Sequence, residues 1–257
     1  MSFQQSYNLL NYNKSNAYED FISKNVKDKI VIDCNAGNGL ITWLCLKYGA
    51  KKVYCLENNQ HAYLHLRNYV FRKNSRVELL NINSVVDDLP KGDIYIHDLF
   101  STLLFDKGLL NFLNNCRKQN ITNLYPNKIQ IVQGIIDKKL EENIVPDQNH
   151  LFDCLHTQAR SYVKLMNKLY PTLLSTQVNV FKSSYNTHNE HYVYDGNLLE
   201  LSELSIKFVD KELSNVWWNA FFNNEYFSSL CSDYNTFNVG MQTLNNFKRC
   251  LRSSLIQ

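Results

Sequence analysis

The chain has 257 residues, of which 44% are hydrophobic and 20% are charged. This composition excludes an intrinsically disordered chain, and a chain of this length can bury a sizeable core without disulfides or metal. The formal net charge of +3 comes from scattered residues, so it gives no support to a nucleic-acid partner.

Two kinds of pattern alternate in the first half of the chain. Apolar residues with helical spacing occupy three segments, at residues 6–25, 40–48 and 59–73. Short runs rich in β-branched residues predict strands at residues 29–33, 52–56, 77–82 and 94–98. Strands and helices that alternate at this spacing form a parallel sheet with helices on both faces.

The pattern changes after Pro126. Residues 128–133 alternate between apolar and polar side chains, as a half-exposed strand does. A helix is expected near residues 150–169, and further strands at residues 176–182, 191–194 and 216–222. We therefore predict an α/β domain at residues 1–125 and a second, mainly antiparallel β region at residues 126–257.

The seven cysteines are spread singly, and no CxxC pair is present. This spacing predicts no metal site, and it favours reduced thiols in a cytoplasmic protein. The N-terminal residues lack a basic region followed by an apolar stretch, and no apolar run is long enough to span a bilayer. We therefore expect neither a signal peptide nor a membrane partner.

A small-residue turn follows the first predicted strand. Gly37 and Gly39 allow the backbone to approach a ligand closely, and Glu57 follows Gly39 by 18 residues. A carboxylate at that position can hold the ribose hydroxyls of a nucleotide cofactor. Asp33 ends the strand before the turn, which is typical of S-adenosylmethionine (SAM) sites and favours SAM over a nicotinamide or flavin. The alternative is a strand–helix turn with two convenient glycines.

The residues around this turn resemble those of protein arginine methyltransferases. That family has a Val-Leu-Asp-x-Gly-x-Gly-x-Gly loop followed by Gly-Ala-x-x-Val-Tyr-Ala-x-Glu, and the matching segments here are Val31–Leu40 and Tyr48–Glu57. Three further segments are similar to the family's N-terminal helix, its catalytic segment and its proline-containing junction, namely residues 9–18, 98–110 and 125–128. The resemblance covers most of residues 3–135.

This resemblance implies a Rossmann-like class I SAM-dependent methyltransferase domain, followed by a barrel-like β region at residues 126–257. Lys14 would neutralise the SAM carboxylate, Glu57 would hold the ribose, and Asn83 and Ser84 would contact adenine. The full set of implied cofactor-binding residues is Lys14, Asp33, Asn35, Gly37, Gly39, Glu57, Asn58, Asn83 and Ser84.

Several positions depart from the family pattern. Asn35 replaces the first glycine, and we expect it to adopt the left-handed backbone that asparagine tolerates. Lys14 replaces an arginine and loses its bidentate fork. Asp98 replaces the first catalytic glutamate, and the second falls at Asp106 or Lys107. The resemblance thus implies an Asp98/Asp106 catalytic pair. A solvated helix start capped by Asp106 is the alternative.

The resemblance implies methyl transfer to a guanidino or other nitrogen acceptor. The acceptor would be an arginine in a protein or peptide, or a small guanidino or amine compound. One alternative is a catalytically inactive homologue that acts as a regulatory subunit, because Asn238–Gly240 also replace the family's Thr-His-Trp loop. Another is a small-molecule methyltransferase. A homodimer, or a heterodimer with an active homologue, is the expected assembly.

Three other groups of residues are candidates for function. Residues 188–191 could bind metal, but a polar turn before a strand is favoured. His97 either lines the pocket or is a neutral histidine at the sheet edge. The aromatic residues are interpreted as core or dimer packing rather than a cation pocket, and they are Trp217, Trp218, Phe221, Phe222, Tyr226 and Phe227.

Overall fold

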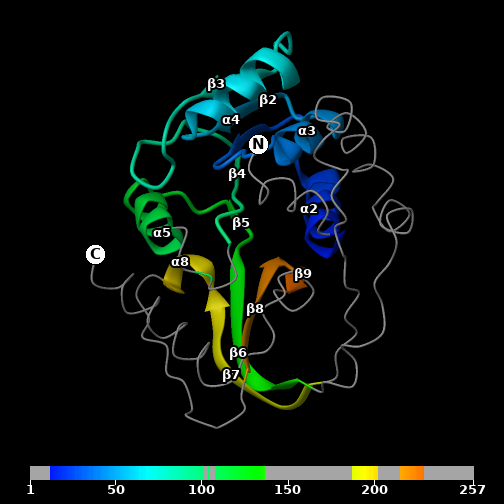
Figure 1. The fold of residues 1–257 in the computed structure, drawn as a ribbon, viewed down its shortest axis with the longest axis vertical. Coiled ribbons are helices and arrows are strands. Elements are labelled where there is room, and N and C mark those ends of the chain that lie inside the picture. The colour runs from blue at the N-terminus through cyan, green and yellow to red at the C-terminus, as the bar shows by residue number, and fades with distance from the viewer. Residues whose placement is uncertain (1–11, 101–103, 105–107, 137–186, 202–214, 229–257) are drawn as a thin grey trace.

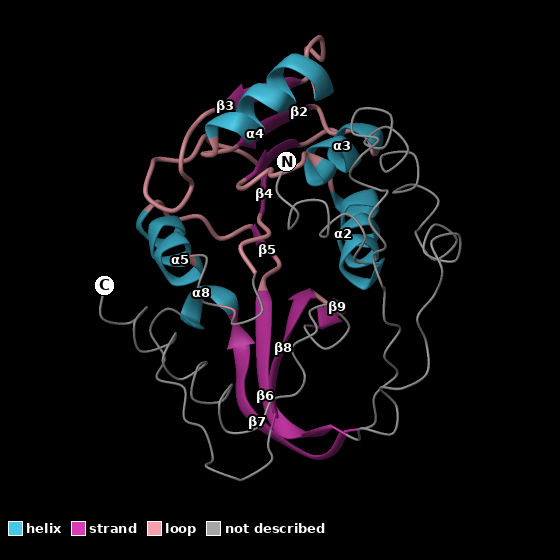
Figure 2. Cartoon of the chain, in the orientation of Figure 1, coloured by secondary structure: helices cyan, strands magenta, loops and turns pink. Residues whose placement is uncertain are grey.

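The computed structural model describes residues 12–100, 104, 108–136, 187–201 and 215–228. These residues form a parallel sheet from the first half of the chain and an antiparallel sheet from the second (Figures 1 and 2). In Figure 1 the last parallel strand, β5, leads directly into the first antiparallel strand, β6. The predicted α/β fold with a second, antiparallel region is therefore confirmed.

The parallel sheet has the strand order β3-β2-β1-β4-β5. In that order the strands cover Val77–Leu80, Lys52–Leu56, Ile30–Asp33, Ile94–Ile96 and Leu124–Tyr125. The central strand β1 pairs in parallel with β2 on one side and β4 on the other. The crossovers therefore run in opposite directions from β1, and ligands bind at this switch point in open α/β sheets. The four predicted strands are present, while the two-residue β5 escaped prediction.

Helices connect these strands. The helix α3 (Leu40–Lys47) joins β1 to β2, and α5 (Leu109–Lys118) precedes β5. The single helix predicted at residues 59–73 is instead a short α4 (Gln60–His65) that continues as the π-helical turn η1 (Leu66–Val70). Asn59 explains the start of α4, because its side-chain oxygen accepts hydrogen bonds from two backbone amides of the first turn.

The antiparallel sheet has the strand order β7-β6-β8-β9. Its strands cover Thr187–Asn197, Lys128–Ile136, Asn215–Phe222 and Glu225–Ser228, with a short helix α8 at Leu198–Leu201. Three of these strands contain predicted ones, whereas β9 was not predicted. The helix expected near residues 150–169 and the strand at 176–182 lie outside the described residues. The parallel sheet ends at Tyr125, and the antiparallel sheet begins at Lys128. The division into two domains at Pro126 stays a prediction.

Aromatic side chains join the antiparallel sheet to helix α2 (Tyr12–Asn25). The Tyr18 and Phe222 rings meet edge to face, with centroids 4.8 Å apart. Trp218 stacks on Phe100, from the loop after β4, at 5.0 Å. The interpretation of this cluster as core is correct for Trp217, Trp218, Phe222 and Phe227, which are buried. Tyr226 is half exposed on the β8–β9 hairpin and does not belong to the core, so its packing at a dimer interface stays a prediction.

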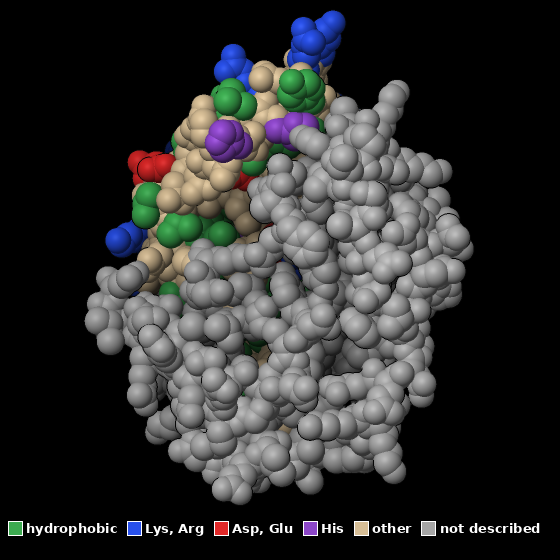
Figure 3. Space-filling model, viewed as in Figure 1, with side chains coloured by type: hydrophobic (Ala, Val, Ile, Leu, Met, Phe, Trp, Pro, Cys, Tyr) green, Lys and Arg blue, Asp and Glu red, His purple; other side chains and the backbone are tan. Residues whose placement is uncertain are grey.

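The structure also bears on the possible metal site at residues 188–191, on membrane spans and on surface charge. His188 and His191 belong to strand β7 rather than to the predicted turn, because pairing with β6 overrides the local polar composition. Within the described ranges, no group of three potential metal ligands occurs, and no helix has the length and apolarity to cross a membrane. Figure 3 shows charged side chains interspersed with apolar and neutral ones on the described part of one face.

Candidate functional site

The turn after β1 uses its two glycines differently. Gly39, with a φ of 88°, begins helix α3 and is buried. A Cβ at this position would lie 2.8 Å from the Leu66 side chain and 3.0 Å from the Phe71 ring. Gly37, with a φ of 57°, faces open space, and the nearest atom to a Cβ there would be 3.9 Å away. Gly39 is therefore required by packing, whereas Gly37 leaves room for a ligand.

Asn35 does not adopt the left-handed backbone that we expected from its position in the loop. The described non-glycine residues with positive φ are Asp28, Leu104, Asn120 and Asn223. Instead, the side-chain oxygen of Asn35 accepts a hydrogen bond of 2.7 Å from the backbone amide of Asp98. Asparagine thus contributes through its side chain, by tying the loop after β1 to the loop after β4.

Asp33 is fully buried beneath the turn. Its Oδ2 atom accepts hydrogen bonds from the Thr42 amide at 3.0 Å and from the Thr42 hydroxyl at 2.7 Å. Burial raises the pKa of this carboxyl to about 7, and the two hydrogen bonds only partly oppose the shift. Asp33 therefore anchors the first turns of α3 to the end of β1.

Glu57 follows strand β2 and is also buried. Its Oε2 atom accepts a hydrogen bond of 2.7 Å from the Gly37 amide, and its Oε1 atom accepts one of 2.7 Å from the Asn59 amide. Burial raises the pKa of the Glu57 carboxyl, while these amides oppose the shift. The carboxylate is therefore held in one orientation beside the glycine turn.

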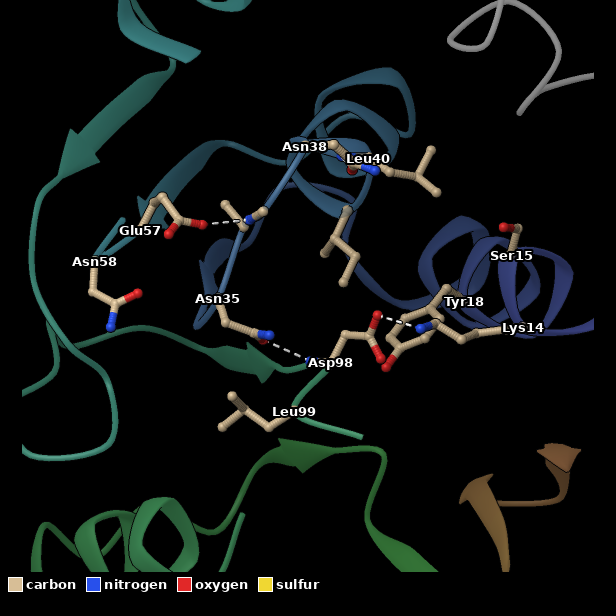
Figure 4. A pocket seen from close by; sticks show the side chains of 13 residues that line it. Lys14, Ser15, Tyr18, Asn35, Asn38, Leu40, Glu57, Asn58, Asp98 and Leu99 are labelled. Carbon is tan, nitrogen blue, oxygen red and sulfur yellow. Dashed lines mark hydrogen bonds and ion pairs between the residues drawn. The ribbon is translucent and has the colours of Figure 1, made fainter. Parts of the chain in front are cut away.

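A cavity of about 240 Å³ opens between the ends of β1, β2 and β4 and helix α2 (Figure 4). It is lined by Lys14, Ser15, Tyr18, Asn35, Ala36, Gly37, Asn38, Leu40, Ile41, Glu57, Asn58, Asp98 and Leu99. The structure thus brings together six of the predicted site residues, which are Lys14, Asn35, Gly37, Glu57, Asn58 and Asp98.

Four predicted site residues lie outside this lining. Asp33 and Gly39 support the turn from below. Asn83 and Ser84 form hydrogen bonds away from the cavity. The Asn83 side chain accepts one from the Val85 amide, and the Ser84 carbonyl accepts one from the Asn115 side chain. Asp106, the second predicted catalytic residue, lies outside the described residues.

The principal ion pair of the pocket joins two predicted site residues. The Lys14 Nζ atom lies 2.5 Å from the Asp98 Oδ2 atom, and the two side chains are 9% and 15% exposed. Figure 4 shows Lys14 reaching from α2 toward Asp98 at the end of β4. Asp98, which we predict to contact the methyl acceptor, is therefore paired in this structure with Lys14, which we predict to contact the SAM carboxylate.

Ser15 and Tyr18 also line the pocket and were missed as site residues. The Tyr18 hydroxyl donates a hydrogen bond of 2.6 Å to the His97 carbonyl. Burial, together with the charge of Asp98, raises the pKa of Tyr18. Ser15 is buried, and its hydroxyl has no hydrogen-bond partner among the described residues. Helical spacing was the available signal, since residues 14, 15 and 18 share one face of α2.

His97 itself does not line the pocket, which favours the alternative of a neutral histidine at the sheet edge. Its ring is fully buried and packs near Phe100 and Phe112, with centroids 5.0 and 5.1 Å away. Burial lowers the pKa of His97 to about 3, which outweighs the opposing effect of the Pro126 carbonyl. The imidazole is therefore uncharged at neutral pH.

Sequence comparison identifies relatives of this chain, although no family model matches it. The chain is 25% identical over 181 residues to protein arginine N-methyltransferase 1 of Oryza sativa subsp. indica, a match that covers 64% of this chain and 45% of the rice protein. It is 30% identical over 149 residues to protein arginine N-methyltransferase 1 of Caenorhabditis elegans, covering 54% and 41%. The matches thus span less than half of these relatives' lengths.

Solved structures show the same fold. The Trypanosoma brucei PRMT1 enzyme–prozyme heterotetrameric complex with AdoHcy aligns with a TM-score of 0.54 at 18% identity, covering 84% of this chain and 73% of that one. Arabidopsis thaliana protein arginine methyltransferase 10 aligns with a TM-score of 0.51 at 16% identity, covering 79% and 68%. In sequence and fold, this chain is therefore similar to the protein arginine N-methyltransferases.

Proposed function

We propose that the chain is a SAM-dependent methyltransferase whose cofactor binds in the cavity between α2 and the ends of β1, β2 and β4. One observation carries the proposal. Lys14, Glu57 and Asp98 line the same cavity, which therefore carries one cationic and two carboxylate side chains. The position of the cavity at the switch point of the sheet is that of nucleotide sites in open α/β folds.

The residues present fit SAM. Glu57 offers a buried carboxylate for the ribose hydroxyls, and Gly37 leaves room for the ligand beside the backbone. Lys14 offers a positive charge for the amino-acid carboxylate. The Ser15 hydroxyl and the Asp98 Oδ1 atom, on two residues that line the cavity, are buried polar atoms without hydrogen-bond partners among the described residues. Bound SAM would supply an electrophilic methyl group.

The acceptor in this proposal is a nitrogen of a protein arginine or of a small guanidino or amine compound. The named relatives are arginine methyltransferases. In this chain, Asp98 and Tyr18 would lie beside the acceptor nitrogen, with Asp106 as a proposed second acid. A carboxylate next to a cationic acceptor orients its nitrogen and stabilises the charge during transfer. Asp33 and Gly39 would contribute by holding the turn in shape.

Calorimetric titration with S-adenosylhomocysteine tests the cofactor site. Glu57→Gln should weaken binding by roughly 10-fold to 100-fold, because a hydrogen bond to a charged group is lost. Glu78→Gln is the matched control, since Glu78 is an exposed residue that pairs with Lys52 on the same sheet. Absence of binding at millimolar ligand, or equal affinities of wild type and Glu57→Gln, would contradict the proposal.

A second candidate function is a non-catalytic subunit of an active methyltransferase. The Lys14–Asp98 ion pair favours this function, because Lys14 neutralises the carboxylate of Asp98 that would otherwise contact the methyl acceptor. One structural relative is described as an enzyme–prozyme heterotetramer. Incubation with labelled SAM, arginine-rich peptides and guanidino metabolites separates the two functions. Incorporation that Asp98→Ala abolishes supports the enzyme. Incorporation only after a co-purified homologue is added supports the subunit.

A further inference from the structure

The Lys14–Asp98 pair occupies the proposed methyl-acceptor end of the pocket. Its Nζ to Oδ2 distance is 2.5 Å, and the Lys14 residue is 7% exposed. The other carboxylate oxygen, Asp98 Oδ1, is buried without a hydrogen-bond partner among the described residues. Asp98 therefore pairs with Lys14 through one of its two carboxylate oxygens.

The two ends of this ion pair are held by different parts of the fold. Asp98 follows β4, and the Asn35 side chain fixes its backbone amide at 2.7 Å. The backbone of α2 is fixed by Tyr18, which donates to the His97 carbonyl and packs on Phe222. The four-carbon stem of Lys14 has several rotatable bonds, so its ammonium can change partners while α2 stays in place.

A buried ammonium requires an anionic partner, because desolvation of an unpaired charge is costly. Asp98 meets this need in the present structure. The proposed ligand brings a carboxylate of its own into the same cavity. Two anions then compete for one cation, and the Asp98 carboxylate loses its partner when the ligand carboxylate takes Lys14.

We propose that Lys14 is a partner-exchange switch that blocks Asp98 until a cofactor carboxylate binds. Before binding, the Lys14 ammonium fills the place of a cationic acceptor on Asp98. After binding, Lys14 pairs with the cofactor, and Asp98 becomes available to an acceptor nitrogen. The proposal rests on the proposed SAM site, and it makes cofactor binding the obligatory first step.

If Lys14 exchanges partners in this way, replacing Asp98 should raise the affinity of the protein for the cofactor. Asp98→Asn removes the competing anion but preserves shape, so it should tighten S-adenosylhomocysteine binding by roughly tenfold. The gain should disappear with 5′-methylthioadenosine, which lacks the amino-acid carboxylate. It should also disappear in a Lys14→Met background, because the exchanged cation is then missing.

Calorimetry on the full chain measures these affinities, and thermal unfolding verifies that each variant is folded. Asp195→Asn is the matched control for Asp98→Asn, because Asp195 forms an exposed pair with Lys128 far from the pocket. Lys24→Met is the control for Lys14→Met, since Lys24 lies on the same helix and pairs with Glu225. Neither control should alter S-adenosylhomocysteine affinity.

The outcomes separate the two proposals. If the wild type binds S-adenosylhomocysteine and Asp98→Asn binds it equally or more weakly, the exchange is wrong while the cofactor site stands. An equal gain with 5′-methylthioadenosine also overturns the exchange. If neither the wild type nor any variant binds, the proposed cofactor site itself fails.

Discussion

Gly39→Ala is expected to lower the free energy of unfolding by about 2–5 kcal/mol. Gly39 has a φ of 88°, and left-handed backbone costs a residue with a Cβ roughly 1–2 kcal/mol. The added methyl group would also lie 2.8 Å from the Leu66 side chain and 3.0 Å from the Phe71 ring. Both neighbours are buried, so relief requires repacking at a further cost of about 1–3 kcal/mol.

Urea unfolding of the two glycine variants separates backbone strain from overpacking. Gly37→Ala shares the positive φ but meets only one atom, 3.9 Å away, so it should cost only the strain of roughly 1–2 kcal/mol. The difference between the variants therefore measures the packing of Gly39 against η1 and the residue after it. Equal losses would show that packing at this position is not limiting.

Asp33→Asn is expected to become progressively more stable than the wild type as pH rises. The folded-state pKa of Asp33 is about 7, whereas the unfolded value is roughly 3.9. Because the folded-state pKa is raised, the contribution of Asp33 is fully present below about pH 4 and is lost as pH rises through 7. The shift of about 3 units corresponds to a relative gain on the order of 4 kcal/mol.

Denaturant unfolding of both proteins from pH 4 to pH 8 measures this difference. The pKa of His97 is lowered, so protonation of His97 destabilises the folded protein at acid pH. This effect is the same in the wild type and the variant, and it cancels in the difference between their free energies of unfolding. Asp195→Asn makes the same substitution at an exposed site and serves as the control for the loss of an aspartate. A pH-independent difference for Asp33→Asn would mean that Asp33 is ionised throughout this range.

Local sequence patterns were sufficient for much of the parallel sheet and for its glycine turn. The β-branched runs at β1 and β2 and the helix between them follow one another within about thirty residues, as expected for a βαβ unit. The π-helical end of α4, the two-residue β5 and the strand β9 were not predictable in this way. Each is set by packing or by pairing with a distant segment rather than by its own residues.

The candidate site divides along the same line. The sequence by itself determined the glycine turn, the position of Glu57 and the likeness to arginine methyltransferases, because these depend on residues close together in the chain. Only the tertiary structure decided that Asn35 acts through its side chain and that Ser15 and Tyr18 line the cavity. It also decided that Lys14 engages Asp98, 84 residues further along the chain, since an ion pair across that separation exists only after the helix and sheet have packed together.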